Sequence, residues 1–251
     1  PPAWLQPATV LPPTVAARRS REWKGKSGST SGRHGTHTAY LLEERLGAIE
    51  GGRQCVLVAS GLAAIANVGL ALLQSGDEVL LPDNAYGPNK ALAAGELKTW
   101  GVTHQFYDAM DAKDLAHKIS SKTKLVWLEA AGSVTLEFPD LIELVRICRG
   151  KGVLCALDNT WGAGLAFQAF ELGDGLGVDI SIHALTKYPS GGGDVLMGSV
   201  ITRDQALHQR IKLCHMRMGF GVGANDVEAV LRSLPSLSLR YQAHDAAARE
   251  L

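Results

Sequence analysis

Short apolar runs alternate with amphipathic segments along most of this 251-residue chain. The runs contain few polar positions, which is typical of strands covered on both faces of a parallel sheet. We expect strands in the segments CVLVAS, EVLLPDN, VTHQFYD, KLVWLEA, VLCALDN, DISIHAL and VLMGSVIT. The helical segments between them predict an α/β fold, with a mostly parallel seven-stranded sheet lying between helices.

The ends of several elements can also be predicted. The last two expected strands are joined by the turn YPSGGGD, and so short a link indicates an antiparallel hairpin. The helix TAYLLEERLGAIE should end at Gly51 and Gly52, because glycine suits the left-handed conformation of a helix C-cap. From Asp204 onward the chain reads as helical, and Pro235 predicts a kink or break there.

The same pattern divides the chain into three parts. Residues 1–38 are rich in Pro, Ser, Gly and Arg and predict an extended N-terminal arm. Residues 39–224 form the predicted large domain, where a ligand would bind. Residues 225–251 are expected to be helical, and the family resemblance described below implies that this helix starts the link to a C-terminal domain.

Composition narrows the classes of function. Lys and Arg together number 25, as do Asp and Glu, so the net charge predicts a small-molecule partner and no nucleic acid. The four scattered cysteines lack zinc-site spacing, so we expect reduced, mostly buried thiols and no metal site. The N-terminal segment lacks the pattern of a secretory signal, and no apolar run is long enough to cross a bilayer. We therefore expect a cytoplasmic protein that does not bind membranes.

In open α/β sheets ligands bind beyond the carboxyl ends of the strands, so the residues that follow each strand are the candidates for chemistry. Gly61 and Leu62 start a helix after the first strand, where backbone N–H groups favour a phosphate. Tyr86 follows the second strand and could stack on a planar ligand. Taken singly, each has a commoner explanation in packing or turn formation.

Two charged residues carry a stronger signal. Asp158 ends a buried strand, where an ionised carboxylate needs a partner; it could cap a helix, form a salt bridge, or keep a heterocyclic nitrogen protonated. Lys187 leaves the apolar strand DISIHAL and enters a glycine-rich turn, an unusual place for a lysine. Desolvation there would favour a neutral amine that can form a Schiff base, so we expect Lys187 to be dry.

A phosphate cradle, a stacking aromatic, a carboxylate for a pyridinium and a Schiff-base lysine together predict a site for pyridoxal 5′-phosphate (PLP). A nucleotide-binding module is the poorer alternative, because it would need GxGxxG or GxxxxGK[ST] after the first strand. The segment ASGLAAIA at that point is neither.

The chain resembles the Cys/Met-metabolism PLP enzymes, which include cystathionine β- and γ-lyases, cystathionine γ-synthase and methionine γ-lyase. The resemblance covers nearly the whole chain and rests on SGRHGT, LEERLGAIEGG, SGLAAI, DNAYGP, LDNTWGAG and HALTKYPSGGGDVLMG. The segment LEAAGSVTLE looks most like bacterial cystathionine β-lyases. The resemblance implies the large domain of the aspartate aminotransferase-like fold, known as fold type I.

The resemblance also implies roles for individual residues. Lys187 would carry PLP covalently, Asp158 would pair with the pyridine nitrogen, and Tyr86 would stack over the ring. The phosphate would be held by the following residues: Gly61, Leu62, Thr186 and, from the neighbouring subunit, Arg33. A homo-oligomer, arranged as a dimer of dimers, is expected on the same ground.

Four departures from the family pattern bear on these expectations. Ser31 stands where the family usually has a tyrosine, so one phosphate and substrate contact is missing. Ala184 replaces a common serine, as it does in similar β-lyases. The usual His-Ser of the glycine turn is replaced within residues 191–194. The C-terminal domain that supplies the carboxylate-binding arginine in the family is not part of this chain.

The function that the resemblance implies is β-elimination of cystathionine, or of a related cysteine S-conjugate, to homocysteine, pyruvate and ammonia. Another reaction of the same family is the first alternative. An inactive PLP-binding fragment is the second, given Ser31 and the missing domain.

Overall fold

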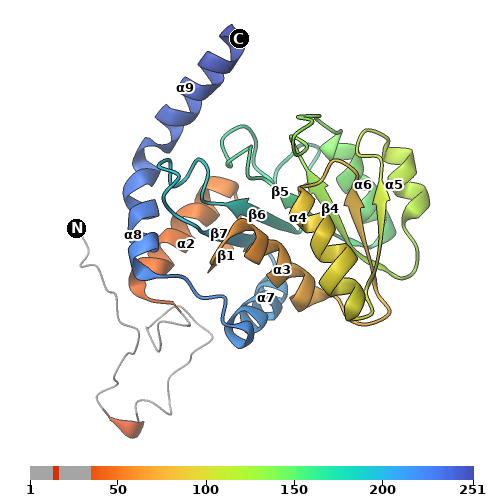
Figure 1. The fold of residues 1–251 in the computed structure, drawn as a ribbon, viewed down its shortest axis with the longest axis horizontal. Coiled ribbons are helices and arrows are strands. Elements are labelled where there is room, and N and C mark those ends of the chain that lie inside the picture. The colour runs from red at the N-terminus through yellow and green to blue at the C-terminus, as the bar shows by residue number, and fades with distance from the viewer. Residues whose placement is uncertain (1–13, 17–34) are drawn as a thin grey trace.

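A twisted sheet forms the centre of the molecule in the computed structural model, which describes residues 14–16 and 35–251. In this part of the chain the sheet has seven strands, in the order β1-β7-β6-β5-β4-β2-β3 (Figure 1). The strands are β1 (Gln54–Val58), β2 (Glu78–Pro82), β3 (Thr103–Tyr107), β4 (Thr123–Glu129), β5 (Leu154–Asp158), β6 (Ile180–Ala184) and β7 (Gly198–Thr202). The predicted fold class is confirmed, since a strand lies in each predicted segment.

Strand directions follow the prediction as well. Strands β3, β2, β4, β5 and β6 are parallel, whereas β6 pairs with β7 in the antiparallel sense. The predicted hairpin is therefore confirmed. Strand β7 also pairs antiparallel with β1, so the sheet has an antiparallel part at one edge.

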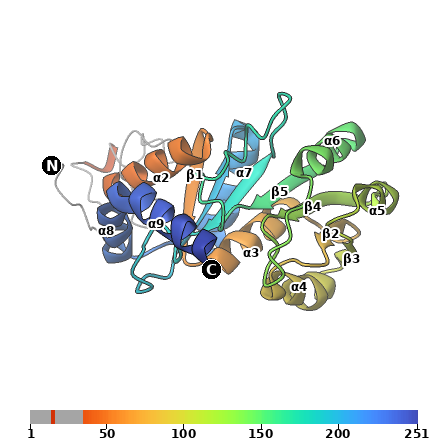
Figure 2. The same ribbon diagram turned by 90° about the horizontal axis from the view of Figure 1, so that it is seen from above.

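Helices cover both faces of the sheet (Figure 2). The main helices are α2 (His37–Glu50), α3 (Gly61–Leu72), α4 (Gly87–Leu92), α5 (Ala112–Lys118), α6 (Leu141–Lys151), α7 (Gln205–Met218), α8 (Ala224–Ser233) and α9 (Leu237–Glu250). Apolar residues of α2, α5, α6 and α8 form one buried cluster, and those of α3 and α7 form another. Strands β1, β2, β4, β5 and β7 contribute alternate side chains to the two clusters, which is why these strands read as continuous apolar runs.

Helix ends agree with the sequence signals. Gly51 ends α2 in the left-handed conformation, with φ of 75°, and the Gly52 N–H bonds the Gly47 carbonyl. Pro235 lies in the short 3₁₀ helix η3 (Leu234–Ser236), which separates α8 from α9. The helix predicted after Tyr86 contains a π-helical segment, η2 (Ala93–Leu97), which the apolar spacing did not predict.

The domain boundaries stay predictions. Most of the arm at residues 1–38 lies outside the described residues, and α2 already begins at His37. Helix α9 extends away from the body of the molecule (Figure 1).

The four cysteines form no disulfide, and three of them are buried, as predicted. Across the described ranges, no helix combines the length and apolar character that a membrane crossing requires, and no cluster of His, Cys, Asp and Glu suits a metal ion.

Candidate active site

A cavity of about 480 Å³ opens at the carboxyl ends of the parallel strands, where α/β folds bind ligands. Six of the seven predicted cofactor residues line it: Gly61, Leu62, Tyr86, Asp158, Thr186 and Lys187. The seventh, Arg33, lies outside the described residues, as does Ser31. Segments that are far apart in the sequence thus contribute to one site.

Asp158 ends β5 and is fixed by the residue two positions later. The backbone N–H and the hydroxyl of Thr160 both donate to Asp158 Oδ1, at 3.1 and 2.6 Å. The Thr160 hydroxyl accepts in turn from the Ala184 N–H at 2.9 Å, which ties the end of β5 to the end of β6. Because both bonds reach Oδ1, the other carboxylate oxygen is available to a donor in the cavity. Desolvation raises the pKa of Asp158, and the Thr160 hydrogen bonds and His183 oppose that rise.

Glu129 ends β4 and is a cavity residue to which the sequence analysis gave no role. It is paired in register with Asp158 and is 5% exposed. Its Oε2 accepts the backbone N–H of Tyr86 at 2.8 Å, so it holds the turn that presents the tyrosine. Burial, and after it the nearby charge of Asp158, raise the pKa of Glu129 to about 8. The signal was present in the sequence, because Glu129 is also an acid at the end of an apolar strand.

The first turn of α3 forms another wall of the cavity. Ser60 caps the helix and accepts the Ala63 N–H at 3.0 Å. The N–H groups of Gly61 and Leu62 lie in this first turn, where the helix itself supplies no acceptor. A Cβ on Gly61 would lie 2.7 Å from the Ala184 Cβ, so glycine is needed for the helix to approach β6 this closely. Gly61 can therefore serve both purposes: it lets α3 pack closely on β6, and it offers a backbone N–H to a phosphate.

Thr186 and Lys187 occupy the turn that follows β6. The Lys187 N–H bonds the Ala184 carbonyl, and the Gly191 N–H bonds the Lys187 carbonyl, so the backbone of the turn is well defined. Lys187 Nζ lies 6.0 Å from the centroid of the Trp161 ring, which also lines the cavity. Lys187 and Asp158 thus share one cavity at the same end of the sheet.

The prediction that Lys187 is dry is wrong for the described chain. The residue is exposed, because the turn presents it to an open cavity rather than to the core. Tyr86, which was expected to stack on a ligand, is also 41% exposed. Any desolvation of these two side chains has to come from what binds over them.

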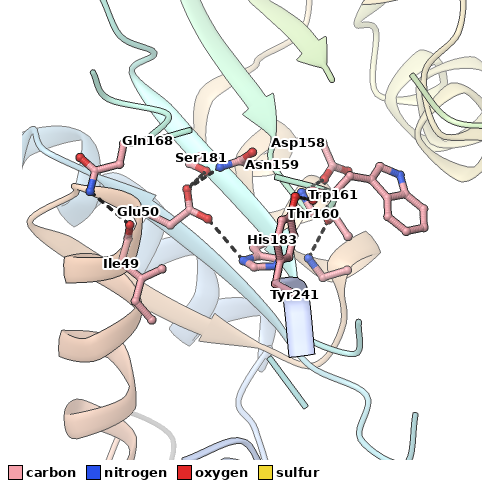
Figure 3. A network of polar contacts seen from close by, with 11 residues as sticks. Ile49, Glu50, Asp158, Asn159, Thr160, Trp161, Gln168, Ser181, His183 and Tyr241 are labelled. Atoms are coloured by element: carbon pink, nitrogen blue, oxygen red, sulfur yellow. Dashed lines mark hydrogen bonds and ion pairs between the residues drawn. The ribbon is translucent and has the colours of Figure 1, made fainter. Parts of the chain in front are cut away.

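A buried polar network lies behind the cavity (Figure 3). Glu50, at the end of α2, accepts from Asn159 Nδ2 at 2.8 Å and from Ser181 Oγ at 3.2 Å, both at Oε2. Its Oε1 lies 3.4 Å from Nδ1 of His183. His183 is buried, at 2% exposed. The Tyr241 hydroxyl donates to the Trp161 carbonyl at 3.0 Å and so connects α9 to the loop beside the cavity.

The residues present fit PLP. The α3 N-terminus suits a phosphate, Tyr86 and Trp161 suit a planar ring, and Asp158 suits a protonated ring nitrogen. Lys187 supplies an amine to the same space. Fold and site together define a class: an α/β enzyme with a cavity suited to a phosphorylated, aldehyde-bearing cofactor.

Comparison with known proteins names the family. Residues 14–251 match the model of the Cys/Met metabolism PLP-dependent enzymes, and the chain belongs to this family. It is 36% identical over 231 residues to a cystathionine β-lyase of Bordetella avium, covering 92% of this chain and 57% of that one. It is 32% identical over 214 residues to a cystathionine γ-synthase/O-acetylhomoserine (thiol)-lyase of Bacillus subtilis, covering 85% and 56%. The chain thus spans little more than half the length of these relatives.

A solved structure from Campylobacter jejuni, which contains N′-pyridoxyl-lysine-5′-monophosphate, shares the fold. The TM-score is 0.88 at 23% identity, and the match covers 94% of this chain and 66% of that one. The expected fold family is therefore confirmed. The family also confirms PLP as the expected cofactor.

Proposed function

We propose that this chain forms the PLP-binding part of a carbon-sulfur β-lyase that acts on cystathionine or a related cysteine S-conjugate. The observation that carries the proposal is the meeting of Lys187, Asp158 and the α3 N-terminus in one cavity. The similarity to a cystathionine β-lyase favours β-elimination over other reactions of the family.

Each cavity residue has a part in this proposal. When bound, PLP supplies an electron sink that acidifies the Cα proton of the amino-acid substrate. Lys187 holds the cofactor, then acts as the base that removes the Cα proton and as the acid that protonates the departing sulfur. Asp158 holds a proton on the ring nitrogen through its oxygen that Thr160 does not bind. With one water consumed, cystathionine gives homocysteine, pyruvate and ammonia.

Phosphate and ring binding fall to the remaining residues. The N–H groups of Gly61 and Leu62, together with Thr186, bind the phosphate, and Arg33 of a neighbouring copy completes this site. Tyr86 covers the ring and excludes water from Lys187, which is the desolvation that the exposed lysine requires. A homo-oligomer is part of the proposal, because Arg33 would act across a subunit boundary.

The first test is covalent trapping. The purified chain is mixed with PLP, reduced with borohydride and digested, and the pyridoxyl group is located by mass spectrometry. We expect the pyridoxyl group on Lys187 and none on Lys90. Lys90 is the matched control, because its amine is already bound to the Asp83 carbonyl. Label on other lysines only would refute the assignment.

The second test separates the family's reactions, because the relative from Bacillus subtilis carries a different activity at a similar identity. Cystathionine is supplied to the PLP-loaded chain, and the keto acid is identified. Pyruvate supports β-elimination, whereas 2-oxobutyrate supports a γ-lyase. Binding of PLP without turnover supports the inactive PLP-binding alternative.

A further inference from the structure

Glu50 is a buried carboxylate without a role in the proposed chemistry. It is 1% exposed, and the two donors at its Oε2, Asn159 and Ser181, are neutral groups. Removing an ionised carboxylate from water costs several kcal/mol, by order of magnitude, unless a cation is nearby. The basic side chain that the structure places beside Glu50 is His183, 2% exposed, with Nδ1 at 3.4 Å from Oε1.

This pair lies on the face of the sheet opposite the cavity. Ile180 and Ile182 of β6 belong to the apolar cluster of α3, so Ser181 and His183 point to the other face, toward α2. The same alternation in β5 directs Asn159 toward Glu50 and Asp158 toward the cavity. Figure 3 shows the pair beside the ends of these two strands.

The two faces are coupled through the backbone of adjacent strands. Asp158 is paired in register with Ile182, and the Asn159 N–H bonds the Ile182 carbonyl at 2.9 Å. His183 is therefore one residue from the register partner of Asp158. Asn159, the residue after Asp158, is held by its side chain on Glu50.

We propose that Glu50 holds His183 as an imidazolium, and that this charge behind the sheet keeps the Asp158 carboxyl ionised for the ring nitrogen of the cofactor. The effect on the cofactor rests on the proposed function, whereas the charge of His183 and the ionisation of Asp158 do not. In this arrangement His183 and Glu50 are positioning residues, which act on the cofactor through Asp158.

Within the described residues, charged or titratable groups lie near Asp158 on both faces of the sheet. Glu129, Lys187 and Tyr86 line the cavity with it, whereas His183 on β6 and Glu50 on α2 lie behind the sheet. His183 lowers the pKa of Asp158, while Glu50 raises it to a lesser degree. The pair therefore favours the ionised carboxyl, against the effect of desolvation.

The first experiment needs neither a variant nor the cofactor. The ¹⁵N spectrum of the His183 ring is recorded in the cofactor-free chain at pH 7. Two protonated ring nitrogens are expected. A neutral imidazole would overturn the inference, whether or not the chain binds PLP.

The second experiment measures the Asp158 carboxyl by ¹³C titration of the cofactor-free chain. His183→Gln keeps an amide near Glu50 but removes the cation, and it should move the Asp158 midpoint upward by about one pH unit. Ser181→Ala is the matched control, because it removes a neutral donor from the same carboxylate and should leave the midpoint within a few tenths of a unit. Equal midpoints in His183→Gln and the parent chain would overturn the inference.

The third experiment links the pair to the cofactor. The chain is loaded with PLP that is ¹⁵N-labelled in the ring, and the ring signal should move from pyridinium-like toward pyridine-like in His183→Gln but not in Ser181→Ala. An unchanged ring signal in His183→Gln would overturn the link. If the parent chain itself does not bind PLP, the proposed function fails, while the first two experiments still decide the role of the pair.

Discussion

Glu129 and Asp158 occupy equivalent positions at the ends of neighbouring strands, yet their surroundings give them different chemistry. Glu129 receives one backbone N–H, from Tyr86, and its pKa is raised to about 8, so it carries a proton at neutral pH. Asp158 receives two hydrogen bonds from Thr160, and His183 further opposes the rise of its pKa. Two carboxyl groups in one cavity can thus serve as a neutral anchor and as an anion for a bound cation.

The largest effect should come from neutralising Asp158. Asp158→Asn keeps the size of the side chain but cannot hold a proton on the ring nitrogen, so pyruvate formation should fall about 10³-fold, with weaker PLP binding. Turnover assays and PLP titration measure the two effects. Asp174→Asn is the control, because Asp174 is an exposed acid paired with Arg146. Turnover within tenfold of the parent chain would contradict the role of Asp158.

The next effect is a pH dependence of stability caused by Glu129. Its pKa is higher in the folded chain, about 8, than the ordinary 4.5, so folding favours the protonated form. Stability is therefore full below pH 4.5 and is lost as the pH rises toward 8, with about 3 kcal/mol lost between pH 4.5 and 7. Urea unfolding of the cofactor-free chain and of Glu129→Gln measures this difference, because glutamine can still accept the Tyr86 N–H.

The comparison with Glu129→Gln separates this group from the others that titrate in the same range. Between pH 4.5 and 7, Glu129→Gln should lose about 3 kcal/mol less stability than the parent chain. Parallel pH profiles for the two chains would show that Glu129 is already ionised at neutral pH, and the contrast with Asp158 would fail.

The difference between the two acids also shows what the sequence could and could not predict. The strands, their directions and the candidate residues at their ends followed from apolar runs, short turns and family motifs. Asp158 was singled out as an acid at the end of an apolar strand and was then matched to the family motif LDNTWGAG, whereas Glu129 was passed over although it also ends an apolar strand. The partners of a carboxyl group are set by strand register, which pairs Glu129 with Asp158 and which a single sequence does not display.

The solvent exposure of side chains was the other property that the sequence did not predict. The apolar strand before Lys187 predicted a dry amine, but the turn directs the side chain into an open cavity. The pair of Glu50 and His183 could not be predicted either, since the two residues are far apart in sequence and meet only because the side chain at the end of α2 reaches β6.

A smaller effect should follow from removing the hydroxyl that fixes Asp158. Thr160→Val loses the 2.6 Å bond to Oδ1 and the acceptor for the Ala184 N–H, while Thr160→Ser keeps both. We expect the pKa of Asp158 to rise by about one unit in the valine variant, with a stability loss of about 1–2 kcal/mol. Carboxyl ¹³C titration and urea unfolding measure these quantities. A serine variant as impaired as the valine variant would contradict the prediction, because serine keeps the hydroxyl that makes both bonds.

The smallest effect should come from Lys90, whose charge lowers the pKa of Glu129 and thus limits the contrast with Asp158. In Lys90→Gln the pKa of Glu129 should rise by a few tenths of a unit, which lowers stability at pH 9 by a few tenths of a kcal/mol. The effect should vanish when Glu129→Gln is also present, because no titrating group then remains to respond. Lys124→Gln is the matched control, since its Nζ also bonds a backbone carbonyl, that of Ser121, but it does not act on Glu129. An equal loss in the presence and absence of the Glu129 carboxyl would mean that Lys90 acts through its bond to the Asp83 carbonyl instead.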